Sequence, residues 1–139
     1  LTPGEKTDKN WIKVVRRFWE SLGTKVSEMD AASHDKMFAS VSHLPHILAY
    51  ACIQAISNVD SQEALVHSGA GLKDFSRIAS SSPQMWADIF LENQKNLLPR
   101  LSAFNEVLTA LEDTIKNNDK RKLVELLGLS KTARDRWMV

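Results

Sequence analysis

Apolar residues recur at every third or fourth position along most of the chain, which is the spacing of an amphipathic helix. One such stripe runs from Asp30 to about Ser57. Its members are Met37, Val41, Leu44, Leu48, Cys52 and Ile56. Asp30 or Ser33 is expected to cap this helix. Pro45 lies inside the stripe and cannot donate a backbone hydrogen bond, so the pattern predicts a long helix that is kinked near Pro45.

A second apolar face begins in the middle of the chain. Ser82 followed by Pro83 is typical of a helix start, because a capping residue precedes a proline that fits the first turn. The face continues past Pro99 to Asn117, which predicts one kinked helix or two abutting helices. Its apolar members are Trp86, Ile89, Phe90, Leu97, Leu101, Phe104, Leu108, Leu111 and Ile115.

Shorter helices complete the predicted helical part of the chain. Asp119 is expected to cap a helix that ends at Gly128, and Ser130 is expected to cap a last one. A short helix is predicted over 61–68, and the segment Gly69–Gly71 is expected to end it and lead into a flexible stretch.

The beginning of the chain follows a different pattern. Leu1 to Pro3 is typical of the end of a strand that enters a turn. Thr7 is expected to cap a helix over 8–22, and Gly23 supplies the left-handed residue that ends it. Thr24–Met29 is then predicted to be a short extended strand.

A strand, a helix and a strand make a fragment of an α/β fold, unlike everything after it. We therefore predict a boundary near Asp30, with a mainly all-α domain over 31–139 preceded by an α/β remnant over 1–30. The chain lacks an initiator methionine at Leu1 and stops at 133–139 without a helix breaker, so it is expected to be a piece of a longer protein.

The helices are more apolar than a single small domain needs for its own core, and such a surplus commonly packs against a partner subunit. We expect the face from Ile89 to Ile115 to form much of a two-fold interface that buries well over about 2,000 Å². The sequence therefore predicts a homodimer.

Composition narrows the class of protein. With 43% hydrophobic and 25% charged residues, the chain is typical of a soluble globular protein. The net charge of +1 gives no broad basic field, so no nucleic-acid partner is predicted. Cys52 is the single cysteine, which favours a reducing compartment. No apolar run is long enough to cross a bilayer, so we expect a cytoplasmic protein without a membrane partner.

The segment from His34 to His46 is the most informative part of the chain. On a helix, Asp35, Ser42 and His46 fall within roughly 40° of one another, away from the apolar stripe, and His43 lies beside Ser42. A polar stripe on a helix usually faces water. Here it holds two histidines around a kinking proline and small neighbours, which favours a ligand pocket.

Three chemistries compete for this segment. A zinc site could use His43, His46 and Asp35, but no cysteine or further carboxylate nearby completes the set. A metal phosphohydrolase would use His34 with Asp35 and needs further ligands on other helices, where only His67 remains. The third is a pocket for an organic anion, in which the imidazoles donate hydrogen bonds. No metal is predicted.

The segment from Gly71 to Ser80 favours the anion pocket. It carries Lys73 and Arg77 among several serine hydroxyls. Arginine presents a rigid fork that matches a carboxylate, so Arg77 is the best single candidate for binding an anionic substrate; the alternative is an exposed loop arginine. Trp86 is either a wall of this pocket or a core aromatic residue.

Three motifs resemble the prephenate/arogenate dehydrogenase family. They are His34-Asp35-x-x-Phe38-Ala39-x-Val41-Ser42-His43-Leu44-Pro45-His46, Phe75-Ser76-Arg77-Ile78-Ala79 and Pro83-x-Met85-Trp86-x-Asp88-Ile89-Phe90-x-Glu92-Asn93. Leu1-Thr2-Pro3 also resembles the family's exit from its nucleotide-binding domain. The likeness covers nearly the whole chain and weakens after about Asn117.

The resemblance implies an enzyme of tyrosine biosynthesis that oxidises prephenate or arogenate with NAD or NADP. Hydride leaves the ring carbon bearing the hydroxyl while a catalytic histidine takes the hydroxyl proton, and loss of carbon dioxide makes the ring aromatic. The helical half dimerises and helps to bind the substrate, and tyrosine is the candidate inhibitor. The substrate-binding residues that the resemblance implies are Arg77, His46, His43, Trp86, Ser42 and Lys73.

The same resemblance assigns residues 1–30 to the end of the NAD-binding domain. The chain has no G-x-G-x-x-G turn, and the family's catalytic histidine belongs to the other half. We therefore expect no catalytic residue and no cofactor site in this chain, which alone should be inactive. The alternatives are arogenate or cyclohexadienyl dehydrogenase specificity, or a non-catalytic helical module for dimerisation or ligand sensing.

Overall fold

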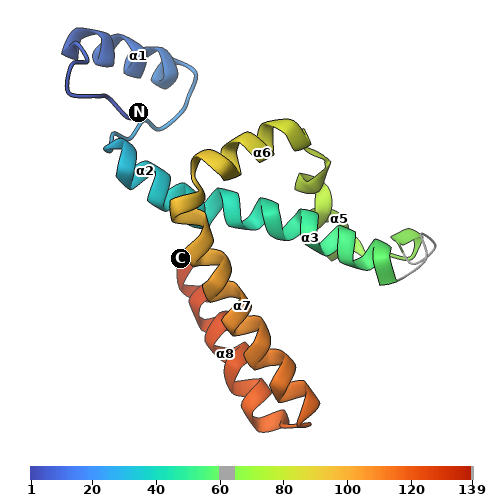
Figure 1. Cartoon of the computed structure of the whole chain (residues 1–139). Coiled ribbons are helices and arrows are strands. Elements are labelled where there is room, and N and C mark those ends of the chain that lie inside the picture. Colours follow the sequence, from blue (N-terminus) through green and yellow to red (C-terminus); the bar gives the residue numbers. More distant parts are fainter. Residues whose placement is uncertain (60–64, 139) are drawn as a thin grey trace. The chain divides into compact units, whose positions relative to one another are not determined.

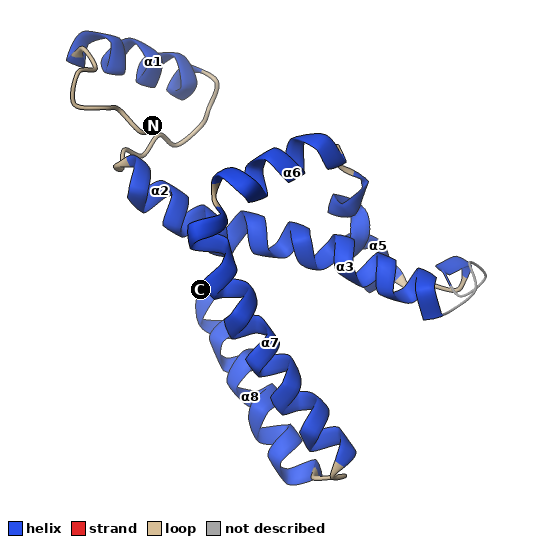
Figure 2. Cartoon of the chain, in the orientation of Figure 1, coloured by secondary structure: helices blue, strands red, loops and turns tan. Residues whose placement is uncertain are grey.

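A computed structural model describes residues 1–59 and 65–138, and within these ranges it contains helices and turns but no strand (Figures 1 and 2). The mainly helical fold predicted from the sequence is confirmed. The elements are α1 (Lys9–Ser21), α2 (Ala31–Phe38), the π-helix η1 (Ala39–His43), α3 (Leu44–Val59), α5 (Ala70–Ser76), the 3₁₀-helix η2 (Arg77–Ser80), α6 (Pro83–Glu92), α7 (Gln94–Lys116) and α8 (Lys120–Trp137). Residues 61–64 of the helix predicted over 61–68 lie outside the described residues. The chain divides into two compact units, Leu1–Leu98 and Pro99–Val139.

Helix α1 begins one residue later than predicted. The Asp8 carboxylate accepts a hydrogen bond from the backbone N–H of Asn10 at 2.7 Å and caps the helix. The Thr7 hydroxyl accepts instead from the N–H of Gly4 at 3.0 Å, so it closes the preceding turn and cannot serve as the cap. Gly23 has a φ of +82°, which confirms the left-handed stop.

The strands predicted on either side of α1 are absent from the described residues, and that prediction was wrong. Leu1 donates to the carbonyl of Ser27 at 2.7 Å and accepts from the N–H of Met29 at 3.1 Å. These two hydrogen bonds join Leu1 to the residues on either side of Glu28, which is the hydrogen-bond pattern of two parallel strands. Because only Leu1 makes them, no ladder forms and 24–29 stays an extended, irregular segment.

Arg16 attaches this segment to α1. Its guanidinium donates to the carbonyl of Val26 at 2.9 Å and to the carboxylate of Glu28 at 2.5 Å. The pKa of Arg16 is raised chiefly because the Glu28 carboxylate accepts this hydrogen bond. The first 30 residues are therefore held together by polar contacts.

The long helix expected from Asp30 is present with one interruption. The Asp30 carboxylate accepts from the backbone N–H of Ser33 at 2.8 Å and from its hydroxyl at 2.6 Å, and these bonds lower the pKa of Asp30. The predicted irregularity near Pro45 takes the form of η1, where the N–H of Leu44 bonds to the carbonyl of Ala39 five residues back. Pro45 has no N–H for the next bond of a regular helix, so the wider π-turn precedes it.

Residues 70–80 are helical, so the prediction of a flexible glycine stretch was wrong. Gly69 takes an extended conformation and α5 begins directly after it, with Gly71 in the first turn. Arg77 then begins η2. The Tyr50 hydroxyl on α3 donates to the carbonyl of Ser81 at 2.7 Å and fixes the end of this segment against α3.

The second apolar face folds as two abutting helices, one of the two predicted alternatives. Ser82 caps α6 through Met85, and Pro83 occupies its first turn as expected. The break falls at Asn93, whose φ of −104° and ψ of 22° end α6. Pro99 lies inside α7 and does not end it.

In the second unit, α8 follows the end of α7 after a short turn, and Figure 1 draws the two as an antiparallel hairpin. Asn118 makes the turn with a φ of +52°, and Asp119 caps α8 as predicted by accepting from the N–H of Lys122 at 2.9 Å. The predicted end at Gly128 and new start at Ser130 were wrong, because α8 continues to Trp137. An interior glycine costs only about 1 kcal/mol relative to alanine, which does not force a helix to end.

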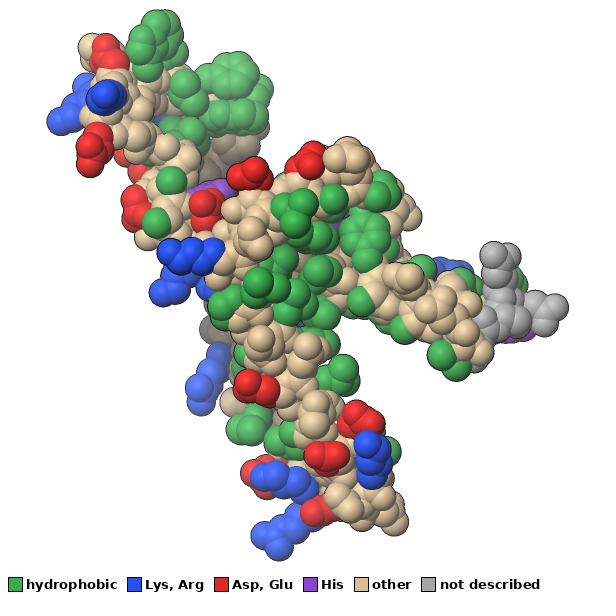
Figure 3. Space-filling model, viewed as in Figure 1, with side chains coloured by type: hydrophobic (Ala, Val, Ile, Leu, Met, Phe, Trp, Pro, Cys, Tyr) green, Lys and Arg blue, Asp and Glu red, His purple; other side chains and the backbone are tan. Residues whose placement is uncertain are grey.

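The buried core of the described residues is small. Its apolar members are Ala39, Ala49, Trp86 and Leu97. Many large apolar side chains stay exposed, and Figure 3 shows them over α1 and along the helices of the second unit. Surplus apolar surface on this scale is typical of surfaces that pack against another domain or subunit.

Candidate functional site

His46 and Trp86 form the centre of the site. Their rings stack with centroids 3.6 Å apart and planes 22° apart, and His43 meets the same indole edge-on at 6.1 Å. Trp86 is 7% exposed and also contacts Phe90 on its own helix. The two histidines predicted to line the pocket thus meet the predicted tryptophan, where α3 and η1 pack against α6.

Ser42 takes part in the site through its backbone carbonyl. Its carbonyl lies 2.9 Å from Nδ1 of His46, and because a carbonyl only accepts, His46 carries a hydrogen on Nδ1. The imidazole of His46 is therefore held from two sides, by this bond and by the indole of Trp86. Within the described residues the Ser42 hydroxyl makes no hydrogen bond to the site, so the expected contact of that side chain with substrate stays a prediction.

His43 lies half-buried beside the stack. Burial lowers its pKa, the Asp35 carboxylate partly offsets this, and His34 and His46 lower it further. Its Nδ1 lies 3.1 Å from the amide nitrogen of Asn93. The lowered pKa favours the neutral imidazole, so His43 is placed as a hydrogen-bonding group.

Asn93 is the site residue that the sequence analysis did not single out. It is 8% exposed, its Nδ2 donates to the carbonyl of Asp35 at 2.8 Å, and its Oδ1 accepts from Asn96 at 2.9 Å. Asn93 therefore joins α2, η1 and the α6–α7 junction. In the sequence, Asn93 could have been found from its position at the end of the third motif, between two helices.

His34 and Asp35 pair with each other. Nδ1 of His34 lies 3.0 Å from the Asp35 carboxylate, and the imidazole stacks on Phe38. Among the residues that the structure describes, no three histidine, cysteine or acidic side chains gather closely enough to hold a metal ion. The zinc and phosphohydrolase readings of this segment therefore have no support in the geometry.

The two predicted cations, Lys73 and Arg77, lie on α5 and η2 and are exposed. Within the described residues, neither side chain makes a hydrogen bond or ion pair with the histidines or Trp86. Their segment is attached to α3 by the bond from Tyr50, one helical turn after His46. The structure thus brings the Arg77 backbone toward the site without joining its side chain to it.

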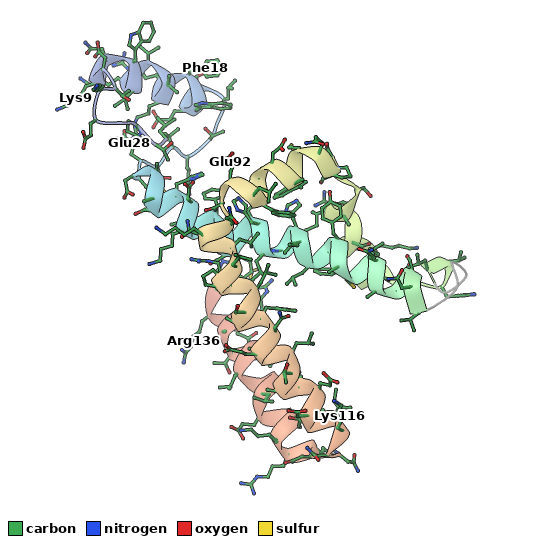
Figure 4. The ribbon with its side chains drawn as sticks, in the orientation of Figure 1. Lys9, Phe18, Glu28, Glu92, Lys116 and Arg136 are labelled. Carbon is green, nitrogen blue, oxygen red and sulfur yellow. The ribbon has the colours of Figure 1, made fainter. Side chains whose placement is uncertain are left out.

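A shallow apolar pocket lies next to the stack. It is lined by Ile47, Tyr50, Pro83, Trp86, Ala87 and Phe90. Figure 4 draws the side chains that pack between α3 and α6 in this region. The indole N–H of Trp86 is buried and finds no acceptor among the described residues, so one polar group of the site is left for another partner.

No helix in the described part of the chain is long and apolar enough to span a membrane.

Comparison with known proteins gives consistent matches. The sequence profile of the prephenate dehydrogenase dimerization domain matches residues 30–129. A cyclohexadienyl dehydrogenase of Zymomonas mobilis is 35% identical over 96% of this chain and 47% of its own length. The crystal structure of prephenate dehydrogenase from Aquifex aeolicus in complex with hydroxyphenyl propionate and NAD⁺ is similar with a TM-score of 0.82 and 40% identity, over 97% of this chain and 48% of that one. Synechocystis arogenate dehydrogenase gives a TM-score of 0.77 and 30% identity, over 98% of this chain and 50% of that one.

Proposed function

The chain belongs to the prephenate dehydrogenase family, and on that premise we propose that it is the dimerising, substrate-binding half of an enzyme that oxidises and decarboxylates prephenate. The chain spans about half the length of the relatives it matches, 47% of the Zymomonas protein and 48% of the Aquifex one. The observation that carries the proposal is the stack of His46 on Trp86 with His43 beside it. All three residues lie in the motifs by which the chain resembles the family.

The chemistry of the cluster suits a ring that bears anionic groups. Prephenate has a six-membered ring with two carboxylates, so a pocket for it needs an apolar wall and fixed hydrogen-bond donors. Trp86 supplies the wall and the histidines supply ring N–H groups. Arg77, on the segment next to α3, supplies the positive charge for one carboxylate.

We propose that the cofactor binds to another part of the protein. NAD or NADP accepts a hydride when bound, but this chain has no G-x-G-x-x-G turn to hold its phosphates. The residues of this chain therefore do not fit the nucleotide. The catalytic histidine that takes the hydroxyl proton is proposed for that other part as well.

Residues 1–30 are proposed to be the end of the α/β domain that binds the nucleotide. Leu1 bonds on both sides of Glu28 in the pattern of parallel strands. Helix α1 exposes Trp11 and Phe18, which Figure 4 labels, and the C-cap Leu22 is exposed as well. Such an exposed apolar face on a helix fits packing against the sheet of an α/β domain.

Prephenate is proposed as the substrate in preference to arogenate. The two differ at one side chain, where arogenate carries an amino group in place of the keto group. The test incubates the complete protein with each compound and with NAD or NADP, and follows the reduced nucleotide by absorbance. Prephenate should be oxidised faster. Faster oxidation of arogenate would reassign the specificity, and no oxidation of either compound would overturn the proposed reaction.

We further propose that the chain forms a homodimer through the exposed apolar residues of α7 and α8. Leu108 and Ile115 are 51% and 65% exposed on α7, and Val124 and Leu127 are 63% and 53% exposed on α8. The matching family domain is described as a dimerization domain. Burying these side chains against a second copy removes them from water.

A charge on this surface should break the dimer. Leu108→Lys places an ammonium group in an apolar interface, and we expect the dimer dissociation constant to rise at least about a hundredfold. Thr109→Lys, the next residue on the same helix, is the control and should leave the constant within about threefold. Sedimentation velocity over a concentration series measures both. A monomeric wild-type chain at micromolar concentration would contradict the proposal.

A further inference from the structure

We propose that Asn93 is a positioning residue that fixes His43 as the neutral tautomer with its hydrogen on Nε2, so that His43 presents an N–H donor to the substrate. The role toward substrate rests on the function proposed above. The tautomer itself rests only on the geometry of this chain.

The orientation of the Asn93 amide follows from its neighbours. The atom of Asn93 that faces the carbonyl of Asp35 at 2.8 Å must be the nitrogen, because a carbonyl oxygen only accepts. The opposite end of the amide accepts from Nδ2 of Asn96 at 2.9 Å, which agrees with this orientation. Asn93 is 8% exposed, so no water competes freely for these bonds.

The orientation decides the tautomer of His43. The same nitrogen of Asn93 lies 3.1 Å from Nδ1 of His43, and its second hydrogen is the one available for that contact. Nδ1 of His43 therefore accepts and carries no hydrogen, which leaves the hydrogen on Nε2. Within the described residues, Nε2 of His43 makes no hydrogen bond of its own.

The neighbouring histidine has the opposite tautomer. Nδ1 of His46 donates to the Ser42 carbonyl at 2.9 Å, so Nε2 of a neutral His46 is an acceptor. One motif thus offers a donor at His43 and an acceptor at His46, next to the same indole. Such a pair can bind a carboxylate oxygen and a hydroxyl group, both of which prephenate carries.

The surroundings of His43 keep it neutral. The titratable groups near it are the Asp35 carboxylate and the imidazoles of His34 and His46, while Trp86 and Asn93 on the α6 side carry no charge. Burial lowers the pKa of His43 more than Asp35 raises it. Protonation of Nδ1 would also set an N–H against the N–H of Asn93, which opposes the cationic form further.

The first test is the imidazole ¹⁵N NMR spectrum of the chain, labelled at histidine and recorded between about pH 5 and 8, the range in which imidazoles titrate. We expect the shifts of His43 to report a hydrogen on Nε2 and those of His46, in the same spectrum, a hydrogen on Nδ1. A hydrogen on Nδ1 of His43 at pH 7 would overturn the inference. This measurement needs no substitution, so it stands even if a variant fails to fold.

Variants of Asn93 extend the test. In Asn93→Asp an acceptor faces Nδ1 of His43, so the hydrogen should move to Nδ1 and the pKa of His43 should rise. In Asn93→Ala the two tautomers should mix. Asn96→Ala is the control, since it perturbs the same helix junction and leaves both donor bonds of Asn93 in place. Variant spectra that match wild type at His43 would overturn the inference.

Kinetics of the complete protein separate this inference from the proposed function. At about pH 8, where His43 stays neutral, Asn93→Asp should raise the KM for prephenate about tenfold and leave the KM for NAD unchanged, because the hydrogen on Nδ1 removes the Nε2–H donor to the anion. An altered tautomer with an unchanged KM would support the fixing of His43 by Asn93 and overturn its role in substrate binding. An unaltered tautomer would overturn the inference whatever the KM.

Discussion

Replacing Arg77 by alanine is expected to weaken prephenate binding by the complete protein about 30- to 700-fold, which corresponds to a loss of about 2–4 kcal/mol. A desolvated carboxylate that loses its cation stays buried without a partner, and this penalty accounts for much of the loss. Folding should change little, because the Arg77 side chain is exposed and makes no hydrogen bond or ion pair within the described residues. Binding of NAD should change little as well.

Three measurements make this expectation specific. Steady-state kinetics with prephenate and NAD varied separately give the effect on each, and a thermal melt reports folding. Arg77→Lys should recover only part of the binding, because an ammonium group cannot reproduce the two parallel hydrogen bonds of a guanidinium. Arg121→Ala, an exposed arginine on α8, is the matched control. A KM for prephenate within about twofold of wild type in Arg77→Ala would make Arg77 an ordinary surface residue.

The elements that the sequence predicted correctly are those fixed by local chemistry. Asp30 and Asp119 cap the helices that follow them, and Gly23 takes the left-handed conformation. Each of these depends on hydrogen bonds within three or four residues, so the residue type alone carries the information. Pro83 also acts locally, because its fixed backbone angle φ suits the first turn of a helix.

A distant contact decides one choice that the sequence left open, and local patterns misled at two other positions. The α6–α7 break lies at Asn93, whose side chain bonds to Asp35, 58 residues away in the chain. The Thr7 hydroxyl is engaged by Gly4, which no helix-capping rule includes. Gly128 stays helical within α8 because one interior glycine costs too little to end a helix.

Part of the candidate site could be predicted from the sequence, and part of it could not. His43, His46 and Trp86, which the resemblance names as substrate-binding residues, lie together in the structure. Their role toward substrate stays a prediction. The tautomers of the two histidines could not be read from the sequence, since each depends on the atom that its Nδ1 faces. The contact of Arg77 with substrate stays a prediction for the complete protein.

The largest expected effect on stability concerns Trp86. Truncating this residue to alanine should lower the free energy of unfolding by about 3–5 kcal/mol, the range for removing a large aromatic side chain from a core. The loss is at the upper end of single substitutions because Trp86 is one of four buried apolar residues in the described chain and contacts His43, His46 and Phe90. Little else in this core can move to fill the space.

Trp86→Phe should cost far less, about 1 kcal/mol, for a reason specific to this site. Phenylalanine keeps an aromatic face for His46 and removes the indole N–H, which is buried without an acceptor. Trp11→Ala is the matched control, since Trp11 is 66% exposed and its loss should cost under about 1 kcal/mol. Urea unfolding followed by circular dichroism at one fixed protein concentration measures all three, because dimerisation makes stability concentration-dependent. If Trp86→Phe proved as destabilising as Trp86→Ala, the N–H would have a partner that stabilises the fold, and the stack on His46 would not be the main contribution of this side chain.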